Sequence, residues 1–155
     1  MFLLFFELQA VIAVIFSLPF LFAAYNTKDE LLPIEIVGLV IAFLSLCGEA
    51  LADHQVKTFK SDPANRDRVC QIGLWRYSRH PNYFFEALVW WGFFLFALGS
   101  PHGWLTVSCP LLMLYFLLKV TGIPLTEMHS LESKGDAYRE YQRTTSAFIP
   151  WFHSS

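Results

Sequence analysis

Four long apolar stretches constrain the fold of this chain more than any other feature. They cover about residues 2–24, 31–52, 83–99 and 104–122. A helix that crosses the hydrocarbon core of a bilayer needs roughly 20 mainly apolar residues. Hydrophobic residues make up 55% of the 155 residues and charged residues only 15%, whereas soluble domains average about 45–50% and about 25%. We therefore predict an all-α integral membrane protein with about four transmembrane helices, forming a single domain over residues 1–155.

The distribution of basic residues predicts how the chain is oriented, because cytoplasmic loops of membrane proteins carry an excess of Lys and Arg. The loop 53–82 carries six of the 11 basic residues, and the tail 123–155 carries three. Four spans place this loop, the tail and the N-terminus on one side, which we predict is the cytoplasm. The net charge of -2, with no run of consecutive basic residues, excludes a nucleic-acid-binding protein.

Two acids and two lysines follow one face at the cytoplasmic end of the second span. They are Glu49, Asp53, Lys57 and Lys60, which fall within an arc of about 80° on a helix with 100° per residue. Such a stripe has the groups to hold a pair of ribose hydroxyls and a phosphate. The alternative is a ladder of i,i+4 ion pairs that closes the helix end.

The segment GLWRYSRHPNYFFE, residues 73–86, combines a helix start with polar side chains. Pro81 suits the first turn of a helix, and Asn82 and Glu86 then lie four residues apart on one face. Three basic side chains precede this helix, namely Arg76, Arg79 and His80. Helix N-termini favour anions, so we predict a phosphate or carboxylate ligand here. The alternative is a basic loop that only obeys the orientation rule.

The tail predicts an amphipathic C-terminal helix. Tyr138, Tyr141 and Thr145 share one face, and Arg139 and Arg143 share another. The tyrosines are suited to stack on a ring or to donate to a phosphate, or else to form an aromatic belt at the membrane interface.

Other familiar sites are missing from the sequence. The three cysteines lack the spacing of a zinc site, so we predict no metal. Neither a Rossmann nor a P-loop glycine motif is present, so any nucleotide is held in another way.

Three segments carry a resemblance to a known family: EALADHQVKTFK, GLWRYSRHPNYFFEALVWWG and TGIPLTEMHSLESKGDAYREYQRTTSAFIPW. Together they resemble the C-terminal domain of steroid 5-alpha-reductases, and specifically the bacterial membrane proteins grouped with that family. The core RHPNY is also shared with sterol reductases and isoprenylcysteine carboxyl methyltransferases. The resemblance implies an integral protein of the bacterial inner membrane.

The resemblance also implies an activity, the NADPH-dependent reduction of a carbon–carbon double bond conjugated to a carbonyl in a lipid-like substrate. Asp53 stands where the reductases place an Asp that contacts the cofactor, and Asn82 and Glu86 match residues at the nicotinamide end. Taken together, the residues and the resemblance predict these cofactor-binding residues: Glu49, Asp53, Lys57, Lys60, Arg76, Arg79, His80, Asn82, Glu86, Tyr138 and Tyr141.

The resemblance assigns the catalytic residues less fully than the cofactor-binding residues. The steroid reductases bind the substrate carbonyl with residues of additional N-terminal helices. Glu86 and Tyr138 are the candidates in the matching region, and Glu7 is the only acid in the first span. A second copy of the chain in a homo-oligomer is another source of the residue that binds the substrate carbonyl. Two alternatives stay open: an S-adenosylmethionine-dependent methyltransferase of the isoprenylcysteine type, using Glu127 or Glu132, and a non-catalytic membrane subunit.

Overall fold

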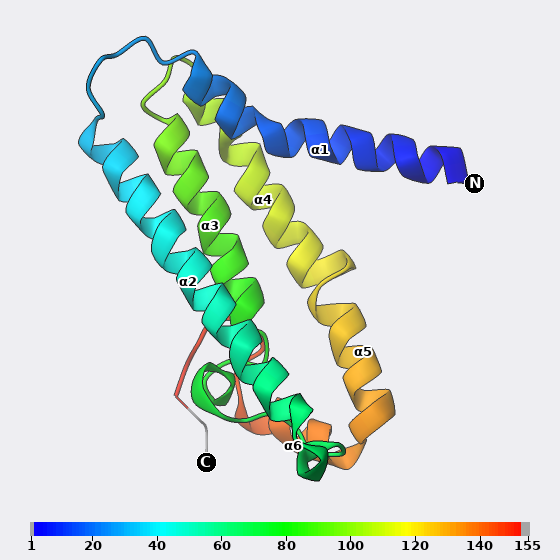
Figure 1. The fold of residues 1–155 in the computed structure, drawn as a ribbon. Coiled ribbons are helices and arrows are strands. Elements are labelled where there is room, and N and C mark those ends of the chain that lie inside the picture. Colours follow the sequence, from blue (N-terminus) through cyan, green and yellow to red (C-terminus); the bar gives the residue numbers. More distant parts are fainter. Residues whose placement is uncertain (1, 153–155) are drawn as a thin grey trace. The chain divides into compact units, whose positions relative to one another are not determined.

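The computed structural model describes residues 2–152, and all regular structure in this range is helical (Figure 1). The α-helices are α1 (Phe2–Ala24), α2 (Pro33–Ser61), α3 (Pro81–Ala97), α4 (Ser108–Tyr115), α5 (Ile123–Lys134) and α6 (Asp136–Thr144). Three short 3₁₀ helices lie at Pro63–Asn65, Gly73–Arg76 and Gly103–Val107, and a π-helical turn covers Phe116–Val120.

Three helical segments are long and apolar enough to cross a membrane: Phe6–Ala24, Pro33–Ser61 and Gly103–Lys134. The third predicted span, 83–99, corresponds to helix α3, which has 17 residues and so matches the lower end of the usual range of about 17–25. The all-α membrane class is therefore confirmed, and three segments meet the criteria of length and composition.

Helix α2 extends beyond the predicted span 31–52, so the first part of the segment 53–82 is helical, as the stripe of Glu49, Asp53, Lys57 and Lys60 on one helix face requires. Residues 53–60 contain no Gly or Pro, and nothing in them stops the helix. The helix ends at Ser61, just before Asp62 and Pro63 start a new turn. The Asp62 side chain accepts the backbone N–H of Ala64 at 2.9 Å, which caps this turn.

The predicted fourth stretch, 104–122, is not one regular helix. It begins as 3₁₀ structure, continues as α4 and ends in a π turn. Gly103 packs so closely that a Cβ there would lie 1.7 Å from the Ala97 carbonyl oxygen. The preceding His102 has a φ of 61°. This tight approach requires glycine at position 103.

The chain forms two compact units. The first consists of Met1–Phe43 and Leu88–Met113. Within it, α2 and α3 approach through glycines, since a Cβ on Gly38 would lie 2.6 Å from the Gly92 carbonyl oxygen. The buried Glu35 accepts the backbone N–H of Leu32 at 2.6 Å, which caps the start of α2.

The second unit consists of Leu44–Ala87 and Leu114–Ser155. It contains the end of α2, the connection 62–80, the start of α3, and helices α5 and α6 (Figure 1). The indole N–H of Trp75 donates to the Ala52 carbonyl at 2.8 Å, and the Ser78 hydroxyl donates to the Phe148 carbonyl at 2.9 Å. These bonds tie the connection to α2 and to the tail. All candidate site residues but Glu7 belong to this unit.

Candidate functional site

An ion pair between α5 and the residues just before α3 organises the second unit. Both the Nε and the Nη2 of Arg79 lie 2.7 Å from Oε1 of Glu127, and His80 Nε2 lies 3.3 Å from the same oxygen. Arg79 Nη1 also donates to the carbonyls of Gln142 and Thr145. The guanidinium is thus engaged within the chain. That it holds a phosphate remains a prediction.

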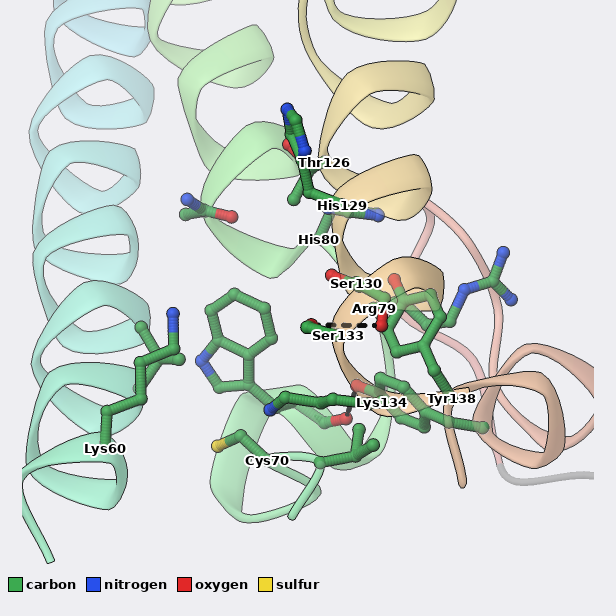
Figure 2. A pocket seen from close by; sticks show the side chains of 15 residues that line it. Lys60, Cys70, Arg79, His80, Thr126, His129, Ser130, Ser133, Lys134 and Tyr138 are labelled. Atoms are coloured by element: carbon green, nitrogen blue, oxygen red, sulfur yellow. Dashed lines mark hydrogen bonds between the residues drawn. The ribbon is translucent and has the colours of Figure 1, made fainter. Parts of the chain in front are cut away.

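A cavity of about 460 Å³ lies beside this ion pair, within the second unit (Figure 2). Its positively charged or basic side chains are Lys60, Arg79, His80, His129 and Lys134. Among the residues that the structure describes, no Asp or Glu lines it. Since ligand sites commonly have volumes of about 300–1,000 Å³, this basic cavity is large enough for an anionic ligand.

The cavity gathers six of the predicted cofactor-binding residues: Lys60, Arg79, His80, Asn82, Tyr138 and Tyr141. The other five predicted residues are not part of its wall: Glu49, Asp53, Lys57, Arg76 and Glu86. Asp53, Lys57 and Arg76 are exposed, while Glu49 and Glu86 are partly buried.

The charged stripe on α2 does not form the ladder of ion pairs that the sequence left open as an alternative. No ion pair joins its acids to its lysines within residues 2–152, so the ladder of i,i+4 pairs is absent there. Glu49, Asp53 and Glu86 instead lie close enough for their negative charges to repel one another. Only Lys60 of the stripe lines the cavity.

Asn82 presents an unused acceptor at the cavity. Helix α3 begins at Pro81, as predicted, and therefore places Asn82 in its first turn. The side-chain Oδ1 is buried and has no hydrogen-bond partner within residues 2–152. A buried acceptor without a partner is costly, and an N–H donor on a ligand would remove this cost.

Helix α6 has the predicted amphipathic arrangement. Tyr138 and Tyr141 are buried, whereas Arg139 and Arg143 are exposed and pair with acids of their own helix. The Tyr141 hydroxyl donates to the carbonyls of Trp75 and Ser78. Burial raises the pKa of Tyr141 well above its ordinary value, so this phenol keeps the proton that it donates.

Tyr138 combines burial with a place in the cavity wall. Burial first, and then the negative charge of Glu127, raise the pKa of the Tyr138 phenol from 10.0 to about 12. The phenol is therefore neutral at physiological pH and can act as a hydrogen-bond donor. Its hydroxyl interacts with Ser130 and Arg79.

This shift predicts an alkaline loss of stability. The neutral phenol is favoured in the folded state, so its contribution is complete below pH 10.0 and is lost as the pH rises toward about 12. The loss should reach about 2–3 kcal/mol when the phenol is ionised. We expect the unfolding temperature of Tyr138→Phe to fall less than that of the wild type over this range. Tyr115→Phe, at an exposed position, should follow the wild type, and identical curves for Tyr138→Phe would contradict the assignment.

Several cavity residues escaped the sequence analysis. Helix α5 contributes Thr126, His129, Ser130, Ser133 and Lys134. Their spacing of three or four residues is that of one helix face, so the pattern was present in the sequence. The pattern did not single out a binding site, because Ser and Thr are common on exposed helix faces.

Trp75 and Cys70 also line the cavity without having been predicted. The Trp75 ring offers a flat apolar surface on which a base can stack. Burial raises the pKa of the Cys70 thiol, so it is protonated and acts as a small apolar group.

The comparisons with known proteins bear on the family of the chain. No curated protein and no solved structure matches it. The family model described as "Protein of unknown function (DUF1295)" matches residues 1–145. The match covers most of both compact units, including every residue of the cavity wall. The chain therefore belongs to the DUF1295 family of membrane proteins.

Proposed function

We propose that this protein is a membrane-embedded NADPH-dependent reductase of a carbon–carbon double bond in an apolar enone lipid, as the resemblance to steroid 5-alpha-reductases implies. The observation that carries the proposal is the cavity wall, which has five basic side chains and no carboxylate among the described residues. NADPH carries three phosphate groups, and the two lysines of this wall, Lys60 and Lys134, can stabilise clustered negative charge. Arg79 and His80 are paired with Glu127 and contribute less.

The polar groups of the cavity fit the chemistry of this cofactor. The buried Oδ1 of Asn82, which has no hydrogen-bond partner within residues 2–152, is an acceptor suited to the carboxamide N–H of a nicotinamide. Lys60 and Lys134 are suited to phosphate oxygens, and Trp75 offers a ring for stacking. Asp53 and Glu49 lie outside the cavity wall, so the proposal assigns them no contact with the ribose hydroxyls.

In this proposal the protein positions the reactants and supplies a proton donor. NADPH, when bound, supplies the hydride. The neutral phenol of Tyr138 is suited to donate a hydrogen bond to a substrate carbonyl and so to stabilise the negative charge that develops on its oxygen. Tyr138 is thus the better of the two catalytic candidates, because Glu86 does not line the cavity.

The orientation of the protein in the membrane is part of the same proposal. Nine of the 11 basic residues lie in residues 53–82 and 123–155, which supports a cytoplasmic position for both segments in a bacterial inner membrane. NADPH would then reach the cavity from the cytoplasm, and the apolar substrate would reach it from the bilayer.

One observation bears on the methyltransferase alternative. S-Adenosylmethionine carries a positive sulfonium and an ammonium, which a basic cavity without carboxylates disfavours. Of the two acids considered for its binding, Glu127 is engaged by Arg79, and Glu132 is exposed. The lining therefore favours the reductase.

The test is a binding series on detergent-purified protein with NADPH, NADH and S-adenosylmethionine. A ligand that binds only the folded state raises its apparent stability by mass action, by about 2.7 kcal/mol at a concentration of 100 times Kd. We expect NADPH to raise the unfolding temperature and S-adenosylmethionine to leave it unchanged.

A turnover assay completes this test. Consumption of NADPH in the presence of enone lipids is expected for the wild type, and Tyr138→Phe should lower the rate while keeping NADPH affinity. Stabilisation by S-adenosylmethionine alone would support the methyltransferase instead. Tight NADPH binding with no turnover on any enone would support a non-catalytic subunit.

A further inference from the structure

An exposed apolar patch lies where the C-terminal tail meets the connection 62–80, within the second unit. Its four side chains are Tyr77, Ile149, Trp151 and Phe152, which are between 40% and 79% exposed. The backbone N–H of Trp151 donates to the Tyr77 carbonyl at 2.9 Å, and the rings of Tyr77 and Phe152 meet edge to face with their centroids 6.3 Å apart. None of the four belongs to the wall of the basic cavity. A cluster of large apolar side chains on a surface commonly marks a contact with a partner or a membrane.

Hydrogen bonds fix the level of the patch along helix α2. Figure 1 shows the connection and the tail together at the C-terminal end of this helix. The indole N–H of Trp75 donates to the Ala52 carbonyl at 2.8 Å, and the backbone N–H of Leu74 donates to the Gln55 side chain at 2.9 Å. Ala52 is the last residue of the apolar stretch 31–52, and Gln55 lies about 4.5 Å further along the helix at 1.5 Å per residue. The connection and the tail bonded to it therefore lie at the level where α2 leaves the hydrocarbon core.

The lipid-facing surface of α2 continues up to this level. Leu44, Leu46 and Leu51 are exposed within the second unit, on a helix that is long and apolar enough to cross a membrane. Trp and Tyr are enriched where hydrocarbon meets headgroups, because each ring is apolar and carries one polar group that stays hydrated. The patch thus has the side-chain types of a membrane interface at the level of that interface.

The charges around the patch fit lipid headgroups. Arg76 directly precedes Tyr77, is exposed, and forms no ion pair within residues 2–152. A guanidinium binds phosphate oxygens well, since it donates two parallel hydrogen bonds. Neither residues 68–80 nor residues 144–152 contain an Asp or Glu, so no carboxylate of these two segments repels a phosphate. This combination favours a lipid surface over a partner protein as the occupant.

We propose that Tyr77, Ile149, Trp151 and Phe152 form a docking surface for the bilayer that the protein crosses. Their side chains insert at the boundary between headgroups and acyl chains, so that the tail is held on the membrane. The inference goes beyond the proposed function, because it holds for any ligand and any reaction. The connection that carries Tyr77 also supplies Trp75 to the cavity wall, so docking would help to fix one side of the cavity.

The test measures the depth of nitroxide spin labels on the full chain in vesicles of phosphatidylcholine and phosphatidylglycerol. The labels are attached at Ile149→Cys and Phe152→Cys, both at exposed positions. Oxygen concentrates in the acyl chains and a nickel chelate stays in water, so the two collision rates report depth. We expect both labels to collide more with oxygen than with the chelate.

The control label reports a position in water. Ser61→Cys is exposed at the end of α2, about 14 Å beyond Ala52 at 1.5 Å per residue. This label should collide more with the nickel chelate. Labelling requires that the native thiols be replaced by alanine, at Cys47, Cys70 and Cys109.

A second measurement keeps the native cysteines, since Cys70 and Cys109 are buried and their replacement could disturb the fold. The emission of Trp151 is obtained as the difference between the wild type and Trp151→Phe. Phosphatidylcholine brominated on its acyl chains should lower this difference at least about twofold, because a ring inserted about 5–10 Å into the boundary is within reach of the bromines. An unchanged difference would overturn the proposal.

The label outcomes are equally decisive. Labels at 149 and 152 that collide mainly with the nickel chelate would place the patch in water and overturn the proposal. Labels shielded from both reagents would show that protein covers the patch, a second copy in this preparation, and would also overturn it. Neither measurement uses a cofactor, so failure of the proposed function and failure of this inference are distinguished.

Discussion

Arg79→Ala is expected to lower the free energy of unfolding by about 3–5 kcal/mol, because it leaves a largely buried carboxylate without its counter-charge. The side chains of Arg79 and Glu127 are only 10% and 16% exposed. Arg79 also donates to the backbone carbonyls of Gln142 and Thr145, which would lose this donor. The loss is measured as the change in thermal or denaturant unfolding in detergent.

The double variant Arg79→Ala/Glu127→Ala tests this explanation. If the unpaired charge causes the loss, removing Glu127 as well should recover part of the stability, so that the two changes are not additive. Arg139→Ala is the matched control. Its pair with Asp136 is exposed, and such surface pairs contribute about 0–1 kcal/mol. A double variant as unstable as the sum of the single variants would contradict a coupled pair.

The expected instability changes how binding data on Arg79 are interpreted. The sequence predicted that Arg79 helps to bind a phosphate or carboxylate ligand. In the structure Arg79→Ala removes the centre of the ion-pair network. Lost binding in Arg79→Ala therefore says little about phosphates, and Lys60 and Lys134 are the better positions for that question.

Gly38→Ala is expected to destabilise the first unit by about 1–3 kcal/mol, the usual cost of forcing an extra group into a packed site. Its Cβ would lie 2.6 Å from the Gly92 carbonyl oxygen and 2.6 Å from the Phe96 amide nitrogen. Both contacts are with backbone, so no change of rotamer relieves them. The clash should outweigh the gain in helix propensity of about 0.5–1 kcal/mol from replacing a helical glycine by alanine.

Gly48→Ala provides the matched control on the same helix. Its Cβ would meet the ring of Phe85 at 2.6 Å, and a ring, unlike backbone, can turn aside. We expect Gly48→Ala to lose less stability than Gly38→Ala in thermal unfolding. A larger loss for Gly48→Ala would show that backbone contact between α2 and α3 does not limit the packing.

Features that depend on local periodicity were predicted well. The apolar stretches, the start of α3 at Pro81 and the two faces of α6 all follow from helix geometry and side-chain type. Helix α2 continues to Ser61 because polar residues end a membrane span without ending a helix.

The site was predicted only in part because its members come from distant segments. The end of α2, the connection, the start of α3 and the tail together bring six predicted residues to the cavity. Helical periodicity alone did not show which end of the charged stripe on α2 would line the cavity. Lys60 does and Asp53 does not, although both lie on the same predicted face.

The sequence by itself determined the class of this protein, because hydropathy and helical period are properties of consecutive residues. It also determined the amphipathic tail helix and the helix start that places Asn82. Only the tertiary structure decided that Arg79 bonds to Glu127, 48 residues away, and that Lys60 and Lys134 line the same cavity. Such pairings depend on how separate helices pack, and no local pattern encodes which of several charged side chains will meet.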